Sequence, residues 1–262
     1  MPEPEIKLMP PIDQYEIRPD DQIERDQVIV SFKSGYGWAD IMTAGNISTL
    51  IGKAKSRKTF FTTLLISSVI TNREVQFSSH LKGNIVLFDT EQGRYHVWRL
   101  SKRIETMIGM YPKSLRIFCL RPLTVRERID TIENYIYQNE TQLVFIDGIR
   151  DLVTDINSAE QATEIVGKLM KWSYDKHCHI CNVLHQNKAD DNARGHIGTE
   201  IVNKSETVIS INKMKNKDYS LVKSEFTRGS EAADFKFSIE NNIPVIDYDG
   251  LVDEEAQEEC TF

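Results

Sequence analysis

Short apolar segments alternate along this chain with longer segments in which apolar residues recur every three or four positions. The short segments are typical of buried β-strands, and the longer ones are typical of helices with one apolar face. Strands are predicted over residues 28–32, 47–51, 84–90, 115–120, 142–148 and 179–184. Helices are predicted over residues 60–71, 94–109, 124–138 and 158–176. This alternation predicts an α/β fold with a mainly parallel central sheet flanked by helices.

The last part of the chain has a different pattern. A short predicted helix, residues 199–204, is followed by three segments of alternating apolar and polar residues at 207–212, 220–226 and 235–239. Residues 216–218, Asn-Lys-Asp, are typical of a hairpin turn between two such strands. The polar stretch 189–198 is predicted to be a flexible loop. We therefore expect the single α/β domain to have a β-rich C-terminal end.

The two ends of the chain differ in composition from its middle. Residues 1–27 are rich in Pro, Asp, Glu and Gln, and residues 249–262 are strongly acidic. These compositions predict an N-terminal arm over residues 1–34, one domain over residues 35–248 and a loosely held acidic tail over residues 249–262. Residues 35–38 hold two glycines and two aromatic residues, and they are predicted to form a turn whose rings pack over the core or stack on a base.

Composition and charge narrow the class of protein. Hydrophobic residues make up 40% of the chain and charged residues 27%, which is ordinary for a soluble globular protein. No apolar run approaches the ~20 residues of a membrane span, and no secretion signal opens the chain. The four cysteines form no disulfide-scaffold pattern, so a cytoplasmic protein is expected. The net charge of −7 does not favour nonspecific binding of nucleic acid by the whole surface.

A phosphate-binding loop is predicted between the strand at 47–51 and the helix after it. Its residues are Gly52, Lys53, Ala54, Lys55, Ser56, Arg57, Lys58 and Thr59. Backbone N–H groups of such a loop and of the first helical turn, here including Phe60, point at an anionic ligand, and the helix dipole favours negative charge there. The expected role of Lys58 is to contact the β- and γ-phosphates, and that of Thr59 is to ligate Mg²⁺.

The loop departs from its usual pattern at one position. Arg57 stands where G-x-x-x-x-G-K-[ST] has its second glycine, a position where the backbone approaches phosphate or takes a left-handed φ. A non-glycine residue is uncommon in that conformation but is not forbidden. Taken alone, this basic loop is also compatible with a solvated turn, so its interpretation depends on the motifs further along the chain.

Acidic residues end two of the later predicted strands. The strand at 84–90 leads into Asp89-Thr90-Glu91-Gln92-Gly93, and the strand at 142–148 ends in Asp147 and a glycine. In open parallel sheets, ligand-handling groups lie beyond the carboxyl ends of the strands. Asp147 is therefore predicted to hold the Mg²⁺, directly or through water, as the partner of the phosphate loop.

These motifs, in this order, resemble the RecA-like ATPase superfamily over roughly residues 40–240. The similarity is greatest to its RepA-type and DnaB-type hexameric helicase branch, which includes small ATPases of bacterial plasmids and mobile elements. The resemblance assigns Glu91 the role of catalytic glutamate and Gln186 that of a γ-phosphate sensor. It also implies that residues 188–198 form a DNA-facing loop, and that Arg228 is an arginine finger acting on the nucleotide of a neighbouring subunit.

The resemblance implies a Mg²⁺-dependent ATPase that works as a homo-oligomer, for which a hexameric ring is one arrangement, and that acts on single-stranded DNA during replication, mobilisation or recombination of a mobile element. Two departures bear on this. Arg57 replaces a glycine, and Phe226 stands where the helicase branch often has a second basic residue before its finger. ATP hydrolysis is therefore better supported than DNA unwinding.

Two other classes of protein stay open at this point. Lys53 stands where partition ATPases of the ParA and MinD kind carry a signature lysine, although the β-rich C-terminal half argues against that class. A regulatory or assembly module that binds nucleotide with little turnover would also accommodate Arg57.

Several polar residues have no settled role. Cys178 and Cys181 suggest zinc only weakly, because there is no second pair and strand alternation turns them to opposite faces. His185 and His196 are as compatible with a solvated loop as with contacts to phosphate or DNA. A set of basic residues either lines a DNA path or is simply solvated: Lys188, Arg194, Lys204, Lys213, Lys215 and Lys217.

Overall fold

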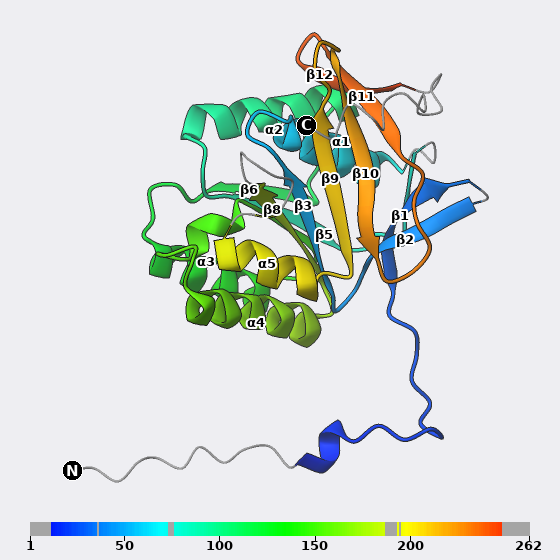
Figure 1. Ribbon diagram of the computed structural model, residues 1–262, viewed down its shortest axis with the longest axis vertical. Helices are drawn as coiled ribbons and strands as arrows, with labels where there is room; N and C mark the ends of the chain where they lie inside the picture. The colour runs from blue at the N-terminus through cyan, green and yellow to red at the C-terminus, as the bar shows by residue number, and fades with distance from the viewer. Residues whose placement is uncertain (1–11, 36, 73–75, 187–192, 194, 248–262) are drawn as a thin grey trace.

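A computed structural model describes residues 12–35, 37–72, 76–186, 193 and 195–247 of the chain. In this part the chain forms one nine-stranded sheet with helices on both faces, and a three-stranded sheet beside it (Figure 1). The order of the large sheet is β12-β11-β10-β9-β3-β8-β7-β5-β6. The mainly parallel α/β fold predicted from the sequence is confirmed.

The parallel half of the sheet carries the motifs. Its strands are β3 (Ile47–Gly52), β5 (Asn84–Asp89), β6 (Leu115–Cys119), β7 (Thr141–Asp147), β8 (His179–His185) and β9 (Thr207–Lys213). Strand β3 lies between β8 and β9, and β8 separates β3 from β7. The phosphate loop and Asp147 therefore belong to strands that are not neighbours, with the end of β8 between them.

The antiparallel half extends the sheet beyond β9. It consists of β10 (Tyr219–Thr227), β11 (Phe235–Glu240) and β12 (Ile243–Asp247). The predicted hairpin turn between β9 and β10 is confirmed, and Asn216 adopts a φ of 60° in it. The sequence did not predict β12. This strand comes after a two-residue turn, Asn241 and Asn242, whose φ values of 48° and 66° suit a tight hairpin.

The helices divide between the two faces of the large sheet, so that two cores form. Helices α1 (Lys58–Thr71) and α2 (Arg94–Ile108) pack on one face, with the three-stranded sheet beside them. Helices α3 (Val125–Gln138), α4 (Ala159–Lys176) and α5 (Gly195–Lys204) pack on the other face. Because both faces are covered, the parallel strands are almost continuously apolar, as their sequences indicated. No helix in the described ranges is long and apolar enough to cross a membrane.

Local contacts define where several helices begin. Ser158 caps α4, as expected, by accepting a hydrogen bond from the backbone N–H of Gln161 at 3.3 Å. Helix α5 starts at Gly195, so residues 195–198 are helical and not the loop predicted from their polarity. A Cβ on Gly198 would lie 2.6 Å from the backbone of Ala193, so this first turn packs too closely for any other residue. The rest of the predicted loop, apart from Ala193, lies outside the described residues.

The small sheet contains residues that the sequence assigned to the arm and to a turn. Its strands are β1 (Val28–Ser34), β2 (Gly37–Thr43) and β4 (Phe77–Ser79). Strand β1 is largely buried, and Phe32 packs on Phe61 and Phe77 with ring centroids 6.4 and 4.7 Å apart. The folded region therefore begins at Val28 and not at residue 35. The segment before it includes a short 3₁₀ helix, η1 (Ile12–Tyr15), and the acidic tail lies outside the described residues.

Candidate active site

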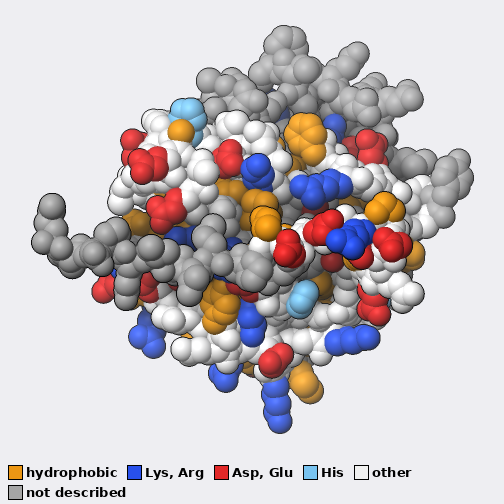
Figure 2. All heavy atoms as spheres, turned by 90° about the horizontal axis from the view of Figure 1, so that it is seen from below, with side chains coloured by type: hydrophobic (Ala, Val, Ile, Leu, Met, Phe, Trp, Pro, Cys, Tyr) orange, Lys and Arg blue, Asp and Glu red, His pale blue; other side chains and the backbone are white. Residues whose placement is uncertain are grey.

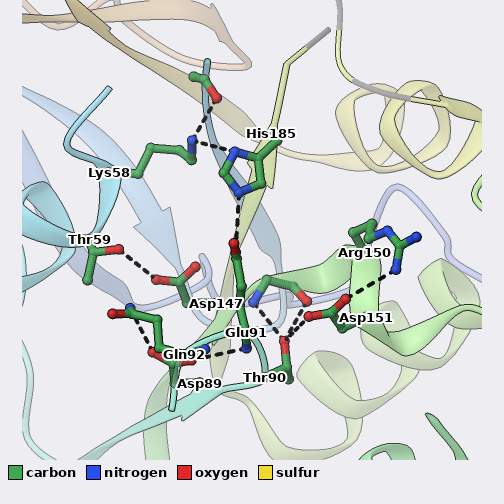
Figure 3. Close-up of polar contacts among 12 residues, drawn as sticks. Lys58, Thr59, Asp89, Thr90, Glu91, Gln92, Asp147, Arg150, Asp151 and His185 are labelled. Carbon is green, nitrogen blue, oxygen red and sulfur yellow. Dashed lines mark hydrogen bonds and ion pairs between the residues drawn. The ribbon is translucent and has the colours of Figure 1, made fainter. Parts of the chain in front are cut away.

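The candidate site lies at the carboxyl ends of four neighbouring parallel strands, β3, β8, β7 and β5. In their register Gly52 is opposite His185, and Asp89 is opposite Asp147. Residues of the phosphate loop, the end of β8 and the two acidic strand ends therefore meet, although long stretches of sequence separate them (Figure 3). This is the position that the sequence predicted for the ligand-handling groups.

The phosphate loop turns back on itself before α1. Lys55 and Arg57 both adopt left-handed backbone conformations, with φ values of 66° and 76°. A left-handed residue other than glycine costs about 1–2 kcal/mol. The Arg57 guanidinium bonds to the backbone oxygen and the carboxylate of Asp218, in the β9–β10 turn. The arginine thus keeps the backbone shape of the usual glycine and links the loop to that turn.

Close packing also shapes the loop at its start. A Cβ on Gly52 would lie 2.4 Å from the carbonyl oxygen of Ile211 and 2.5 Å from the hydroxyl of Ser56, so only glycine fits. The Ser56 hydroxyl is buried and has no hydrogen-bond partner among the described residues. An unsatisfied buried donor is costly, and an oxygen of a bound phosphate would satisfy it.

Lys58 lies in the first turn of α1, with 6% of the residue exposed. Its ammonium group donates to the carbonyl oxygens of Gly52, at 2.7 Å, and Lys53, at 3.0 Å, and to Nδ1 of His185, at 3.0 Å. These three acceptors use all three ammonium hydrogens. Burial lowers the pKa of Lys58 to about 8, although two nearby carboxylates act in the opposite direction. A nucleotide phosphate would have to displace at least one of these acceptors to reach the ammonium.

Thr59 and Asp147 form the candidate magnesium site. The Thr59 hydroxyl donates to the Asp147 carboxylate at 3.3 Å. Burial, together with the charges of Asp89 and Glu91, raises the pKa of Asp147 to about 7. Hard oxygen donors of this kind suit Mg²⁺, which commonly takes one or two protein ligands and completes its shell with phosphate and water. The described residues contain no group of three or more His, Cys, Asp or Glu side chains that would bind a metal by themselves.

Asp89 and His185 hold Glu91 from two sides. The Asp89 carboxylate accepts hydrogen bonds from the backbone N–H groups of Glu91, at 3.1 Å, and Gln92, at 2.7 Å, which sets the turn after β5. The Glu91 carboxylate lies 3.2 Å from Nε2 of His185. This hydrogen bond is the largest cause that lowers the pKa of Glu91, so the carboxylate stays ionised. Because Lys58 occupies Nδ1, the arrangement fits a neutral His185 that donates from Nε2.

A pocket of about 440 Å³ opens over these residues. It runs from the phosphate loop along α2 to Arg99, Arg103 and Asn242. The Arg103 guanidinium lies over the Phe60 ring, 3.9 Å from its centroid, and donates to the backbone oxygen of Asn242 at 2.9 Å. The volume and the cationic wall suit a small anionic ligand with an extended body.

The structure separates two predicted site residues from this cluster. Gln186 is buried next to His185 but does not line the pocket, whereas His185 does. Arg228 is exposed just beyond β10, where β10 pairs with the start of β9, at the opposite end of the sheet from the phosphate loop. The sequence left His185 as compatible with a solvated loop or with contacts to phosphate or DNA, and the structure brings it into the cluster. Its place at the end of the strand after β7 was the signal available for this position.

The remaining predicted residues fall into different places. Lys213, Lys215 and Lys217 surround the β9–β10 turn, whereas Lys204 lines a separate pocket near Arg228. Lys188 and Arg194 lie outside the described residues. Cys178 and Cys181 belong to opposite cores, as strand alternation predicted, and burial raises the pKa of both thiols to about 12.

Comparison with known proteins agrees with this geometry. No curated protein matches the sequence. A family model described as an AAA domain matches residues 35–191, which is more than half of the chain and includes the phosphate loop, Glu91, Asp147 and His185. The chain therefore belongs to this family of RecA-like P-loop ATPases.

Proposed function

We propose that the protein binds ATP with Mg²⁺ and hydrolyses it, with Glu91 as the residue that activates water. One observation carries this proposal: Lys58, His185 and Glu91 form a continuous chain of hydrogen bonds beside the Thr59–Asp147 pair. Phosphoryl transfer to water requires neutralised phosphate charge and an oriented nucleophile, with little covalent chemistry. The cluster holds groups for both tasks.

Each residue has a distinct part in the proposed reaction. Lys58 turns from its acceptors to the β- and γ-phosphates, and the Ser56 hydroxyl and loop N–H groups donate to phosphate oxygens. Thr59 and Asp147 hold Mg²⁺, which neutralises phosphate charge when bound. The ionised Glu91 orients a water molecule and accepts its proton. Asp89 keeps the Glu91 backbone in place throughout.

His185 acts in this proposal as a positioning residue between the phosphate lysine and the glutamate. When phosphate draws Lys58 away from Nδ1, His185 retains its bond to Glu91 or transfers its donor to the γ-phosphate. In the second case, the orientation of Glu91 depends on whether a nucleotide occupies the loop. These contacts support His185, in preference to Gln186, as the proposed sensor of the γ-phosphate.

An oligomeric enzyme is proposed on the position of Arg228. Arg228 lies at the opposite end of the sheet from Lys58, so it is too far away to contact a nucleotide bound by its own subunit. An exposed arginine there is able to reach the site of an adjacent copy, as an arginine finger does. ATP hydrolysis by isolated monomers would then be weak.

Single-stranded DNA is the proposed polymer partner. Acidic and basic side chains are interspersed over the face seen in Figure 2, which therefore does not offer a continuous basic surface. Lys213, Lys215 and Lys217 instead gather at the β9–β10 turn, which Arg57 joins to the phosphate loop through Asp218. DNA contacts at that turn would be coupled to nucleotide binding through this link.

The family match favours the RecA-like interpretation over a ParA-like partition ATPase. A binding module with little turnover remains the second candidate function, since Arg57 occupies the position of a loop glycine. The two candidates differ in one measurable property, which is the rate of ATP hydrolysis per subunit.

The test is ATP hydrolysis as a function of protein concentration, with and without single-stranded DNA, for the wild type and for Glu91→Gln and Arg228→Ala. We expect the rate per subunit to rise with concentration and with DNA, and to fall about 10³-fold or more in either variant. Measurable ATP binding with a flat, negligible rate would establish the binding module instead. A rate unchanged in Glu91→Gln would contradict the proposed mechanism.

A further inference from the structure

A second pocket, of about 450 Å³, lies between α2 and the edge strand β6. Its walls include Trp98 and Tyr111, which are 51% and 42% exposed, and the half-buried Phe118. Tyr95 stacks against Trp98 with ring centroids 5.7 Å apart. The candidate active site uses none of these rings. Exposed aromatic surface gathered at a pocket is characteristic of interaction sites.

Positive charge surrounds this aromatic pocket. Arg94 and Arg121 line it, and Arg116 is exposed on β6. None of these three arginines forms an ion pair with another described residue, whereas Arg126, on α3, pairs with Asp130 at 3.6 Å. On a chain with a net charge of −7, unpaired arginines around aromatic walls favour an acidic occupant.

The strand beside the pocket favours an extended polypeptide. Strand β6 is the last of the large sheet, and its outer edge pairs with no other strand in the described ranges. An extended segment is able to bond to such an edge through its backbone while its side chains enter an adjacent pocket. A polypeptide is therefore able to use both the backbone groups of the β6 edge and the pocket, whereas a nucleic acid would not pair with the strand edge.

We propose that the pocket binds the acidic segment of residues 248–262 from a neighbouring copy of the chain. Six carboxylates and no Lys or Arg occur in this segment: Asp249, Asp253, Glu254, Glu255, Glu258 and Glu259. The carboxylates complement the three arginines, and the adjacent Leu251 and Val252 supply apolar side chains for the aromatic walls. The contact joins one copy to the next.

Distance favours a neighbouring copy over the same molecule. The segment begins after β12, at one edge of the nine-stranded sheet, and the pocket lies at the other edge. Eight strand spacings of about 4.8 Å separate the two edges by roughly 38 Å. Fifteen residues span at most about 50 Å, so a path around α1 and α2 would use nearly the whole segment. Copies arranged head to tail bring the two edges together.

A charge-exchange experiment on the full chain tests this contact by sedimentation velocity without nucleotide. One variant carries Arg94→Glu and Arg121→Glu, and the other carries Glu254→Lys, Glu255→Lys and Glu258→Lys. We expect each variant alone to self-associate about tenfold or more weakly than the wild type, and an equimolar mixture to recover association. Association returns because each altered surface meets its complement only in the other variant.

This experiment measures self-association and not ATP hydrolysis, so its failure is distinguishable from a failure of the ATPase test. The variant Arg126→Glu, at an exposed and already paired arginine, should associate as the wild type does, and circular dichroism should show both test variants folded. A monomeric wild type, or variants that associate normally, would overturn the proposal. Variants that stay dissociated when mixed would assign the contact to the same molecule. Loss of single-stranded DNA binding by the arginine variant, with association intact, would assign the pocket to DNA instead.

Discussion

Among single residues, two ionisable groups of the site have shifted pKa values. Asp147 carries a pKa raised to about 7 by burial, and Lys58 a pKa lowered to about 8 by burial. Both shifts come from an environment that disfavours charge. Magnesium beside Asp147 and phosphate beside Lys58 would each favour the charged form. Each residue is thus suited to a ligand whose charge is opposite to its own.

This environment predicts pH-dependent magnesium binding. Below a pH of about 7 the Asp147 carboxyl holds a proton that Mg²⁺ must displace, so we expect affinity to fall about tenfold for each pH unit below that value. Above it, the dependence should level off. Calorimetric titrations of Mg²⁺ from about pH 5.5 to about pH 8.5 measure this. Asp147→Asn should bind weakly and lose the pH dependence, and an unchanged slope in that variant would place the proton elsewhere.

The same pKa predicts the sign of a stability effect. The folded carboxyl titrates at about 7 and the unfolded one near 3.8, so the folded state holds more protons between these values. The free energy of unfolding contributed by Asp147 therefore decreases as pH rises from about 4 to about 7. Urea unfolding without Mg²⁺ should show this decrease in the wild type and lack it in Asp147→Asn.

His185 is predicted to affect turnover more than nucleotide binding. It contacts both Lys58 and Glu91, so His185→Ala should lower kcat about 10- to 100-fold, because Glu91 loses its orienting partner. The dissociation constant for ATP should change less than about threefold, since two carbonyl oxygens still hold Lys58. The matched variant Gln186→Ala, one residue along, reports on the sensor that the sequence predicted. Equal losses of kcat in both variants would contradict a distinct role for His185.

At the scale of secondary-structure elements, the phosphate loop depends on the β9–β10 turn. Arg57 bonds to Asp218, whose side chain is 83% exposed. An exposed ion pair contributes only about 0–1 kcal/mol, but here it also holds a left-handed arginine. We expect Arg57→Gly to be neutral or slightly stabilising because glycine adopts this φ freely. Asp218→Ala should weaken ATP binding a few-fold in the wild-type background and have no effect when combined with Arg57→Gly.

A second link between elements is Arg103, which joins α2 to the β11–β12 turn. It donates to Asn242 through Nε and Nη2 and stacks over Phe60. Removing these contacts in Arg103→Ala should lower the free energy of unfolding by about 2 kcal/mol, because the Phe60 ring loses its cation and the Asn242 oxygens and the buried Thr63 hydroxyl lose a donor. Lys102→Ala, on the same helix, is the control: its exposed ammonium pairs with Glu105, so its loss should change the free energy of unfolding by less than about 0.5 kcal/mol.

Most elements could be predicted because their signals are local. The buried strand β5 and the capped helix α4 are evident from a few consecutive residues. Strand β12 and the start of α5 were missed, since the first depends on an Asn-Asn turn and the second on close packing against Ala193. Strand β1 was predicted as a strand, but it was assigned to the N-terminal arm and not to the domain. Its burial depends on the phenylalanine cluster around Phe61, which no short window contains.

At the scale of the whole molecule, the two proposed intermolecular contacts lie away from the phosphate loop. Arg228 lies at the opposite end of the sheet, and the aromatic pocket lies at the β6 edge. Copies arranged head to tail would form both contacts, since each contact joins two different surfaces of the chain.

Mixing inactive variants tests whether Arg228 acts between copies. Glu91→Gln and Arg228→Ala should each hydrolyse ATP poorly alone. In a mixture, some interfaces pair an intact Glu91 with an intact Arg228 of the neighbour, so we expect recovery to about a quarter of the wild-type rate with random assembly. The control is a mixture of Glu91→Gln and Lys58→Ala. Both changes lie in the nucleotide site of their own subunit, so no subunit in that mixture has an intact site. Absence of recovery in the first mixture would show that Arg228 does not complete a neighbouring site.

Local patterns were enough to specify the strand–loop–helix unit at residues 47–71, the acidic strand ends at Glu91 and Asp147, and the α/β class, because each depends on the period and chemistry of neighbouring residues. The folded chain alone reveals that His185 lies between Lys58 and Glu91, and that Arg57 is held by Asp218. These contacts join residues 94 to 161 positions apart. They exist because β8 lies between β3 and β7 and because β10 pairs with β9. Strand order of this kind is set by the packing of the whole chain, which local patterns do not record.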